Sequence, residues 1–401
     1  MRKVSIMTIL ILIFLSIILQ GENHPTSSVI AAINARWDGG YPIYFGVIGD
    51  NYDSNRIFKA VLNQIEYISD SIDFIITTGD HTGGGDSLGY YQYLSAIDTL
   101  TVPWLTTIGN HEMNDSLGWN RFIEFFGYPD FCLDIGDFRF ISLTNCYPAP
   151  GPVSGWENVY YKFESEQLDW FESKLSEWDG HKFVFIHAPP YLDGHIIIGT
   201  LGSYGYSPGY EESLTERFTD IIRDNNVYIC FCGHIHCFDR WKASNEQYGN
   251  VTYIITGGAG GTLCPWFYGE PYGGTFYHFM LMELYEDGTL FGHMIFPDTV
   301  EDGVTTIEYD EIYSFELEPP VGISQKQKIL DEISKPYPNP FNSAVVVPVS
   351  YETKRITVCD ISGKTVAVIN HDGTGIVHWK PDLSVSSGFY FIQGNKILFI
   401  R

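Results

Sequence analysis

The chain has 401 residues, of which 23 are basic and 49 are acidic, so its formal net charge is −26. A chain of this length can form one large and one small domain, with a buried core that needs no disulfide for stability. Proteins that hold nucleic acid by charge present a basic face to the phosphates, so the acidic balance argues against a nucleic acid bound in that way. A metal site remains compatible with it, because bound cations supply their own positive charge.

The N-terminal segment has the pattern of a targeting signal. Residues 1–3 are positively charged at Arg2 and Lys3, 6–19 form an almost continuous aliphatic run, and polar residues follow from Gln20. This is typical of a Sec-type secretory signal peptide, which we place at residues 1–21. The alternative is a single transmembrane anchor, but the run is shorter than the roughly 20 residues that a membrane span requires. We therefore expect an exported bacterial protein, secreted or held at the cell surface.

From about residue 40 the chain alternates predicted strands and helices. Two strands, over 131–135 and 138–143, meet at a Gly-Asp hairpin signal. The other apolar strands are expected over 44–48, 74–78, 104–108, 183–186 and 227–232, and the helices over 55–68, 88–100, 164–177 and 211–224. The remainder up to residue 317 alternates like antiparallel strands. Parallel strand–helix–strand units followed by β-rich returns predict a layered α/β domain with mixed sheets over 40–317.

A change of composition separates a C-terminal unit. Five prolines frame a Lys/Ser-rich stretch between 316 and 340, which predicts a linker over 318–336. Short strands are expected after it, over 345–349, 355–359, 365–369, 375–379 and 388–393. This pattern predicts a small β-sandwich domain over 337–401.

The chain has seven cysteines without a CxxC pair of the zinc-ribbon type. Export permits disulfides, and Cys132 and Cys146, which flank the predicted hairpin, could pair. Cys230 and Cys232 stand two residues apart in an apolar strand, so both point to one face and are expected to be small core residues.

Three consecutive predicted strands end in a glycine followed by an oxygen ligand. The pairs are Gly49-Asp50, Gly79-Asp80 and Gly109-Asn110, at equal steps of 30 residues, about one strand–helix unit each. Parallel strands at equal steps bring their last residues to one edge of the sheet, where ligands bind in open α/β folds. Each glycine is expected to allow a tight turn that directs the next side chain into the crevice.

Two more predicted strands end in imidazoles. His187 follows the strand over 183–186, and His234 and His236 follow the strand over 227–232. Histidines at i and i+2 share one side of an extended segment, so both can face the same crevice. Taken singly, a histidine after a strand is usually a hydrogen-bonded residue and a Gly-Asp pair is a common turn. Five such endings at strand carboxyl ends together predict a metal centre.

These motifs resemble those of the calcineurin-like metallophosphoesterase superfamily over about residues 43–297. The most specific parts are Gly109-Asn110-His111-Glu112 and Gly233-His234-Ile235-His236. The resemblance implies a four-layer α/β/β/α sandwich with a dinuclear centre, in which Asp80 bridges the two metals. It also implies that one metal is completed by Asp50 and His236, and the other by Asn110, His187 and His234. His111 would be the acid that protonates the leaving oxygen or stabilises the transition state.

The implied chemistry is hydrolysis of a phosphate ester with two divalent transition-metal ions. Two ions roughly 4 Å apart hold both the attacking and the leaving oxygen of an in-line displacement, and attack by a metal-bound hydroxide removes the need for a Ser or Cys nucleophile. The mixed nitrogen and oxygen ligands favour Mn, Fe, Zn or Co over Ca.

Two departures from the family pattern concern the metal site. Relatives place His or Gln two residues after the first Asp, where this chain has Tyr52. Tyr52 could bind as a phenolate, leave Asp53 to assist, or leave the first metal weakly held. We favour a Tyr52 side chain that points into the site. The Asp80 motif lacks the Tyr that purple acid phosphatases place three residues after their Asp. The resemblance of residues 236–240 to that subfamily therefore does not predict a purple enzyme.

Three neighbouring features have weaker functional signals. His81 adjoins Asp80 and is expected to point away from the crevice if Asp80 points into it. His195 lies in a loop-like stretch between two ligand strands, where it could line a substrate wall or lie on the surface. The run Gly257–Gly261 lacks the Lys-Ser/Thr of a P-loop, so a close backbone approach beside the metal site is expected instead.

The C-terminal unit resembles the sorting domain of type IX secretion substrates. The resemblance is carried by residues 337–342, 360–364 and 387–390, with Arg401 at the end. It implies passage across an outer membrane through that secretion machinery, followed by removal of the domain or surface attachment. The alternative is an accessory β-sandwich domain, for example one that binds carbohydrate.

The sequence therefore predicts a secreted metallophosphoesterase that acts on small phosphate monoesters or nucleotides to scavenge phosphate. One alternative is a phosphodiesterase or nuclease of the same superfamily, which the acidic body disfavours for long polyanions. The other is a non-catalytic binding protein whose first metal site has decayed at Tyr52. Metal stoichiometry separates them, because two bound ions support an enzyme and one or none supports a binding protein.

Overall fold

The computed structural model divides the chain into two compact units, Met1–Pro320 (the large unit) and Val321–Arg401 (the small unit). The residues it describes are 23–52, 55–149, 159–190, 211–242, 251–264, 273–297, 314–319, 344–348, 355–360, 364–370, 376–382, 384–392 and 395–399. The predicted signal peptide, Asp53, His195 and most of the predicted linker lie outside these residues. No helix within the described ranges is long and apolar enough to span a membrane.

The first sheet of the large unit has the strand order β14-β13-β12-β1-β2-β3. Its strands are β1 (Ile43–Ile48), β2 (Phe74–Thr77), β3 (Trp104–Leu105), β12 (Phe279–Leu284), β13 (Leu290–Ile295) and β14 (Ser314–Leu317). β1, β2 and β3 run parallel, whereas β12 joins β1 in the antiparallel sense. The expected combination of parallel units with antiparallel returns is confirmed.

The second sheet has the order β10-β11-β9-β8-β5-β4. Its strands are β4 (Phe131–Ile135), β5 (Phe138–Ser142), β8 (His181–Phe185), β9 (Ile229–Cys232), β10 (Phe238–Lys242) and β11 (Thr252–Thr256). β5, β8, β9 and β11 are parallel to one another, and β4 and β10 close the two edges antiparallel. A short pair, β6 (Cys146–Pro148) and β7 (Val159–Tyr161), stands apart from both sheets.

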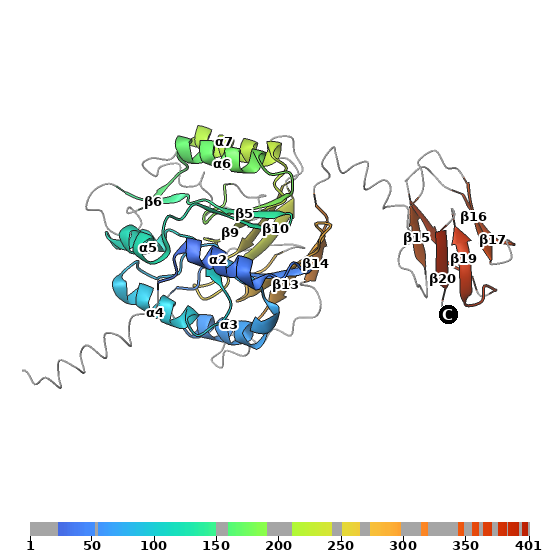
Figure 1. The fold of residues 1–401 in the computed structure, drawn as a ribbon, viewed down its shortest axis with the longest axis horizontal. Helices are drawn as coiled ribbons and strands as arrows, with labels where there is room; N and C mark the ends of the chain where they lie inside the picture. The colour runs from blue at the N-terminus through green and yellow to red at the C-terminus, as the bar shows by residue number, and fades with distance from the viewer. Residues whose placement is uncertain are drawn as a thin grey trace, which may run out of the picture. The chain divides into compact units, whose positions relative to one another are not determined.

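Helices cover the outer faces of the two stacked sheets (Figure 1). On the first sheet lie α3 (Arg56–Tyr67) and α4 (Ser87–Ile97), and on the second lie α6 (Ser165–Ser176) and α7 (Glu212–Asp224). Side-chain caps fix two of the helix starts, because Asn55 accepts the N–H of Phe58 and Asp86 accepts that of Gly89. The layers form the α/β/β/α sandwich implied by the family resemblance.

Strand side chains alternate between two cores. In β1 the odd residues Phe45 and Val47 enter the core between the sheets, while Ile48 faces the helices. Aromatic rings fill the space between the sheets, with the Phe45 and Phe140 centroids 5.2 Å apart and those of Phe74 and Phe140 5.3 Å apart. Burial of each such side chain contributes roughly 1.5–3 kcal/mol, so this layer holds the strand ends in fixed positions.

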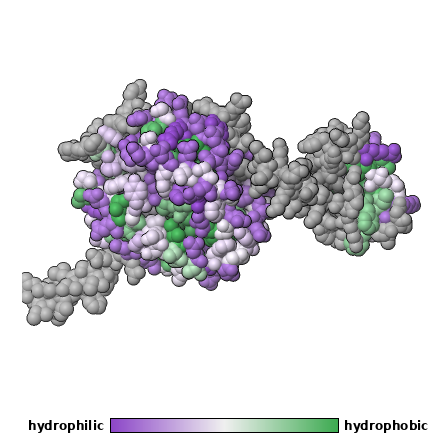
Figure 2. Space-filling view, turned by 45° about the horizontal axis from the view of Figure 1, so that its top comes forward, coloured by the Kyte–Doolittle hydropathy of each residue, from purple (hydrophilic) through white to green (hydrophobic). Residues whose placement is uncertain are grey.

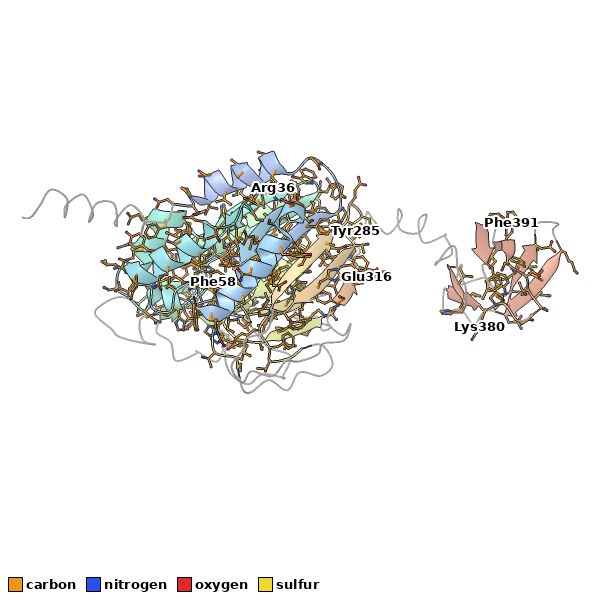
Figure 3. All side chains as sticks on the ribbon, turned by 90° about the horizontal axis from the view of Figure 1, so that it is seen from below. Arg36, Phe58, Tyr285, Glu316, Lys380 and Phe391 are labelled. Atoms are coloured by element: carbon orange, nitrogen blue, oxygen red, sulfur yellow. The ribbon has the colours of Figure 1, made fainter. Side chains whose placement is uncertain are left out.

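Two helices were not predicted from the sequence. Helix α2 (Thr26–Arg36) has only weak apolar periodicity in its sequence, and its buried residues are Val29 and Ile33. It ends at Arg36 (Figure 3), whose guanidinium donates to the carbonyls of Ser69 and Ile72 at 2.7 and 3.1 Å and so holds the helix in place. Helix α5 (Gly118–Phe126) begins without a side-chain cap, which removes the usual start signal. The predicted strand over 104–108 also proved too long, because pairing with β2 stops at Leu105.

All seven cysteines lie in the described residues and are free thiols. The suggested Cys132–Cys146 pair is not formed, since Cys132 stands opposite Ile141 in the β4–β5 register. Cys230 and Cys232 are completely buried, as expected of core residues.

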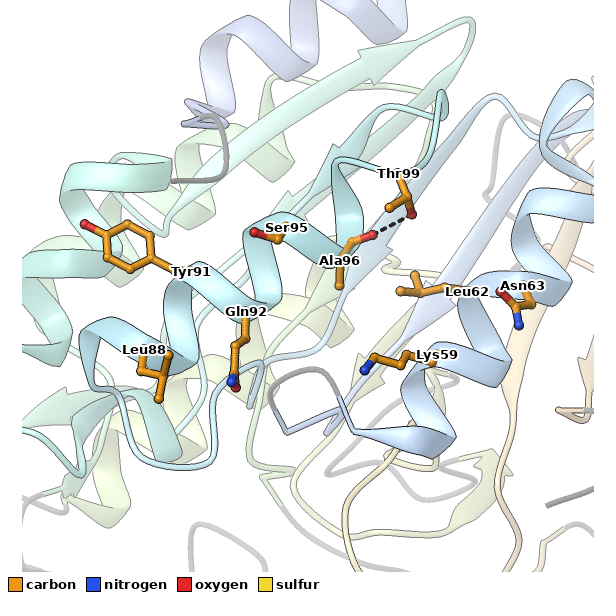
Figure 4. A pocket seen from close by; sticks show the side chains of 9 residues that line it. All are labelled: Lys59, Leu62, Asn63, Leu88, Tyr91, Gln92, Ser95, Ala96 and Thr99. Carbon is orange, nitrogen blue, oxygen red and sulfur yellow. Dashed lines mark hydrogen bonds between the residues drawn. The ribbon is translucent and has the colours of Figure 1, made fainter. Parts of the chain in front are cut away.

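Two surface features of the large unit lie on the helical layers. Hydrophilic residues gather over α6 and α7 (Figure 2), in keeping with the acidic composition. A groove of about 440 Å³ runs between α3 and α4 (Figure 4). It is lined by Lys59, Leu62, Asn63, Leu88, Tyr91, Gln92, Ser95, Ala96 and Thr99, none of which is a predicted site residue.

The small unit is a β domain. Its two-stranded sheet pairs β15 (Val345–Pro348) with β18 (Ile376–Trp379). Its four-stranded sheet has the order β17-β16-β19-β20, formed by β16 (Arg355–Asp360), β17 (Thr365–Asn370), β19 (Gly388–Ile392) and β20 (Asn395–Phe399). Val345, Val358, Trp379 and Tyr390 from both sheets share one core.

Candidate metal centre

The predicted ligands converge at the carboxyl ends of the parallel strands. Two groups of side chains among the described residues bring their ligand atoms within 4.8 Å of one another. The inner group is Asp80, His187 and His234, and the outer group is Asp50, Asp80 and His236. Asp80 belongs to both groups, so its carboxylate stands where it can serve two ions.

The backbone at the ligands departs from the expected form. Asp50, Asp80 and His234 themselves adopt positive φ, at 58°, 57° and 69°. Among the three glycines that precede the oxygen ligands, all of which are described, only Gly79 has a positive φ, of 101°. The left-handed turn therefore lies at Asp50 itself in the first pair and at both Gly79 and Asp80 in the second, while neither Gly109 nor Asn110 has a positive φ. Left-handed backbone at a non-glycine residue costs of order 1–3 kcal/mol and marks a site that the surrounding structure over-determines.

The glycines that precede the oxygen ligands instead allow neighbouring loops to pack closely. A Cβ on Gly49 would lie 2.8 Å from the carbonyl oxygen of Thr256, and one on Gly109 would lie 2.9 Å from Cε1 of His187. Real Cβ atoms do not approach other atoms that closely, so only glycine lets the ligand loops lie against one another at these points.

The Asp80 carboxylate is buried and surrounded by donors. Its Oδ1 accepts the backbone N–H of His111 at 2.8 Å and lies 3.4 Å from Nε2 of His187. Burial favours the neutral acid, but His187 and His111 outweigh it and hold the pKa of Asp80 below its ordinary range. The carboxylate is therefore anionic, which is the form that can ligate a cation.

In the inner group, lone pairs of neighbouring side chains point toward one another, which suits a bound cation. Nδ1 of His187 lies 2.7 Å from the carbonyl of Thr78 and must carry a proton there, which turns Nε2 toward Asn110. Nε2 of His187 and Nδ1 of His234 lie 2.8 and 2.7 Å from Asn110 Oδ1, and 3.2 Å from each other. These acceptor atoms repel unless a proton or a metal ion lies among them.

The pKa of His187 agrees with this description. Burial alone would lower it, but the Asp80 charge prevails and raises the pKa to about 9. A second proton on His187 thus compensates the Asp80 carboxylate, and a cation at the same place would replace that proton.

The outer group lies closer to solvent. Nδ1 of His236 lies 2.5 Å from the carbonyl of Thr262, and its Nε2 lies 3.4 Å from Oδ1 of Asp50. Burial opposes protonation of His236, but its hydrogen bond to Asp50 raises its pKa. The His236 and His111 side chains are 16% and 17% exposed, whereas Asp50 and Asp80 are almost completely buried. The site therefore opens on the side of the outer group.

Tyr52 points into the site, as favoured from the sequence. Its hydroxyl lies 2.9 Å from Nε2 of both His111 and His236, and 3.5 Å from Oδ2 of Asp80. Burial, together with the charges of Asp80 and Asp50, raises the pKa of this phenol. The phenol thus stays protonated until a cation neutralises the carboxylates around it.

His81 and the glycine run lie beneath the ligands. The ring of His81 points away from the crevice, with Nε2 2.8 Å from the Thr107 carbonyl, and burial lowers its pKa to about 3. In the glycine run, Gly261 donates its N–H to the Asp50 carbonyl at 2.7 Å. The expected close backbone approach beside the site is confirmed.

Sequence reasoning missed a role for Glu112. It is completely buried and accepts hydrogen bonds from the backbone of Asp80, His81, Thr82 and Gly109. The Gly-Asn-His-Glu motif contains this residue, but the spacing does not show which N–H groups it meets.

Comparisons with known families agree with this geometry. Residues 43–238 match the model of the calcineurin-like phosphoesterase family. The large unit carries a calcineurin-like phosphoesterase domain. Residues 335–397 match the model of the secretion system C-terminal sorting domain, which points to export of this protein.

Similar proteins are phosphatases and phosphodiesterases by name. "Purple acid phosphatase 1" of Ipomoea batatas is 25% identical over 253 residues, which cover 53% of this chain and 45% of the relative. "Probable glycerophosphodiester phosphodiesterase GpdQ" of Arcobacter nitrofigilis is 27% identical over 197 residues, covering 46% of this chain and 65% of the relative. The chain spans about half the length of the phosphatase relatives.

Among solved structures, the purple acid phosphatase PPD1 from yellow lupin (Lupinus luteus) seeds shares the fold. Its TM-score is 0.52 at 16% sequence identity, and the match covers 70% of this chain and 55% of that chain.

Proposed function

We propose that this protein is a secreted, metal-dependent phosphoesterase that hydrolyses phosphate monoesters or nucleotides. The observation that carries the proposal is the shared position of Asp80 in two adjoining ligand groups at the mouth of a phosphoesterase domain. A single carboxylate common to two groups of imidazole and carboxylate ligands suits a pair of ions rather than one.

The ligands divide between the two ions. The outer ion would be held by Asp50, Asp80 and His236, with the Tyr52 hydroxyl as a further ligand, and the inner ion by Asp80, Asn110, His187 and His234. Mn, Fe, Zn or Co suits this mixture of nitrogen and oxygen donors. Such a pair neutralises phosphate charge and activates water for attack on phosphorus.

The chain's own groups bind and orient the ester. His111 belongs to neither ligand group, yet its Nε2 lies at the opening and its Nδ1 is held 3.0 Å from the Gly83 carbonyl. Because Nδ1 is held in this way, a proton on Nε2 can be donated to a leaving oxygen without turning the His111 ring. The Tyr52 hydroxyl, 2.9 Å away, restrains that nitrogen.

Small monoesters or nucleotides are supported by the phosphatase relatives and by the net charge of −26, which opposes long polyanions. A diesterase is the second candidate. It is favoured by the relative named as a glycerophosphodiester phosphodiesterase. The match covers 65% of the length of that relative, compared with 45% of the length of the Ipomoea batatas phosphatase.

Export is part of the proposal. The sorting domain would direct the chain to an outer-membrane secretion machinery, after a signal peptide at residues 1–21 has taken it across the inner membrane. Substrates would then be phosphate esters outside the cell or at its surface.

The test combines metal content and hydrolysis on the full chain after loading with Mn or Zn. We expect two ions per chain and faster turnover of p-nitrophenyl phosphate than of bis-p-nitrophenyl phosphate. Asp80→Asn is the control, and it should lose both metal and turnover because Asp80 belongs to both groups. A preference for the diester would support the second candidate. One ion or none, with no turnover of either compound, would refute an enzymatic role.

A further inference from the structure

We propose that Glu112, which belongs to neither ligand group, is a positioning residue that sets the metal affinity of the centre by joining the loops after β2 and β3. The inference rests on the proposed metal centre and concerns a residue outside both ligand groups. Asp80 lies on the first of these loops and Asn110 on the second, so their separation decides whether ligands from both can meet one ion.

The contacts of Glu112 divide between the two loops. Its Oε1 accepts the N–H groups of His81 and Thr82 at 2.8 and 2.9 Å. Its Oε2 accepts those of Asp80 and Gly109 at 3.1 and 2.8 Å. One carboxyl group therefore accepts hydrogen bonds from the loop that carries Asp80 and from the loop that carries Asn110.

The connection between the loops is reciprocal. The Asp80 carboxylate accepts the N–H of His111, which precedes Glu112, at 2.8 Å. Each loop thus holds the other through a carboxylate, and Glu112 cannot shift without moving the bridging ligand. Its backbone is confined as well, because a Cβ on Gly85 or Gly118 would lie 2.8 or 2.9 Å from the Glu112 carbonyl carbon.

The burial of Glu112 makes these hydrogen bonds necessary. Within the described part of the chain, its hydrogen-bond donors are backbone N–H groups and the Thr82 hydroxyl, and the side chain is completely buried. Loss of an acceptor atom would leave buried N–H groups without a partner, which is unfavourable unless the loops move.

The amide variant Glu112→Gln removes hydrogen bonds to the loops but keeps the volume of the side chain. Glutamine has almost the same shape, but its NH₂ group is a donor and would face two backbone donors, those of His81 and Thr82 or those of Asp80 and Gly109. Two of the four backbone hydrogen bonds would then be lost. Changes to groups that orient metal ligands typically reduce metal affinity by about 10–100-fold.

The matched control is Asp130→Asn. Asp130 is also a carboxylate that joins separate segments, because it accepts the N–H of Thr144 at 2.6 Å and the amide of Gln167 at 3.0 Å. Its hydrogen-bond partners in the described residues lie in neither ligand loop, so its removal tests the general effect of losing a partly buried carboxylate.

The experiment titrates the metal-free full chain with Zn or Mn against a chelating indicator dye, and records the melting temperature with and without metal. For Glu112→Gln we expect roughly 10–100-fold weaker binding, two ions at saturation, and a smaller rise of the melting temperature on metal addition. For Asp130→Asn we expect wild-type metal affinity and a wild-type rise of the melting temperature on metal addition.

Wild-type metal affinity in Glu112→Gln would overturn the inference and leave the metal centre intact. Absence of metal from the wild-type chain would instead refute the proposed function, and this inference with it. If Glu112→Gln does not fold, Glu112→Asp decides, because it keeps a carboxyl group but is too short to reach both loops. Weaker binding in that variant would support the inference, and unchanged binding would overturn it.

Discussion

The substitution Gly79→Ala tests whether the ligand loops require close backbone contact. Gly79 joins β2 to Asp80 and has a φ of 101°. A Cβ there would lie 2.8 Å from the Gly109 Cα, 2.9 Å from the Gly109 nitrogen and 2.5 Å from Nδ1 of His187. None of these atoms moves freely, because Glu112 accepts the Gly109 N–H and Nδ1 of His187 is bound to the Thr78 carbonyl.

Two costs add at this position. An alanine with left-handed backbone costs about 1–2 kcal/mol. Insertion of a methyl group into a packed region costs about 1–3 kcal/mol more. We therefore expect the free energy of unfolding to fall by roughly 2–5 kcal/mol, with weaker metal binding because the added methyl group pushes against His187.

The control is Gly39→Ala, which isolates the backbone cost. Gly39 has a φ of 88°, and a Cβ there would meet no atom within 4 Å. Urea denaturation of both metal-free variants, followed by tryptophan fluorescence, measures the difference. Gly79→Ala should be less stable than Gly39→Ala by about 1–3 kcal/mol. Equal losses in the two variants would refute the claim that close loop packing requires glycine at position 79.

Three further predictions concern single side chains. His111→Ala should reduce turnover of p-nitrophenyl phosphate by roughly 10²–10⁴ with two metals retained, because His111 is the proposed acid and no ligand; a full rate would exclude it from the mechanism. Tyr52→Phe keeps the ring and removes the hydroxyl beside His236, so we expect weaker binding of the outer ion alone in a two-site titration. Unchanged affinity at both sites would show that Tyr52 is no ligand. Burial raises the pKa of Asp130 to about 7. The folded chain therefore keeps a proton that the unfolded chain releases above about pH 4, and stability falls as the pH rises from 4 to 7. Relative to Asp130→Asn, the wild-type free energy of unfolding should fall by about 2–4 kcal/mol over this range, and a constant difference in urea denaturation would contradict the assignment.

The sequence by itself was sufficient for the layered fold and for the residues that meet at the site. Equal steps of 30 residues between Gly-Asp and Gly-Asn motifs, each after an apolar strand, predict parallel neighbours with their ligands at one sheet edge. The structure brings Asp50, Asp80 and Asn110 together there. Such signals are local, since a strand pattern and the residue that follows it can be recognised without knowledge of the rest of the chain.

Other features were decided only by the tertiary structure. Helix α2 has little apolar periodicity, and contacts from Arg36 to carbonyls more than 30 residues away hold it in place. The left-handed backbone at Asp50 and Asp80, the direction of Tyr52 and the partners of Glu112 likewise depend on atoms from different loops. The physical reason is that backbone N–H and C=O groups are present at nearly every residue, so a sequence does not show which of them a buried carboxylate or imidazole will meet.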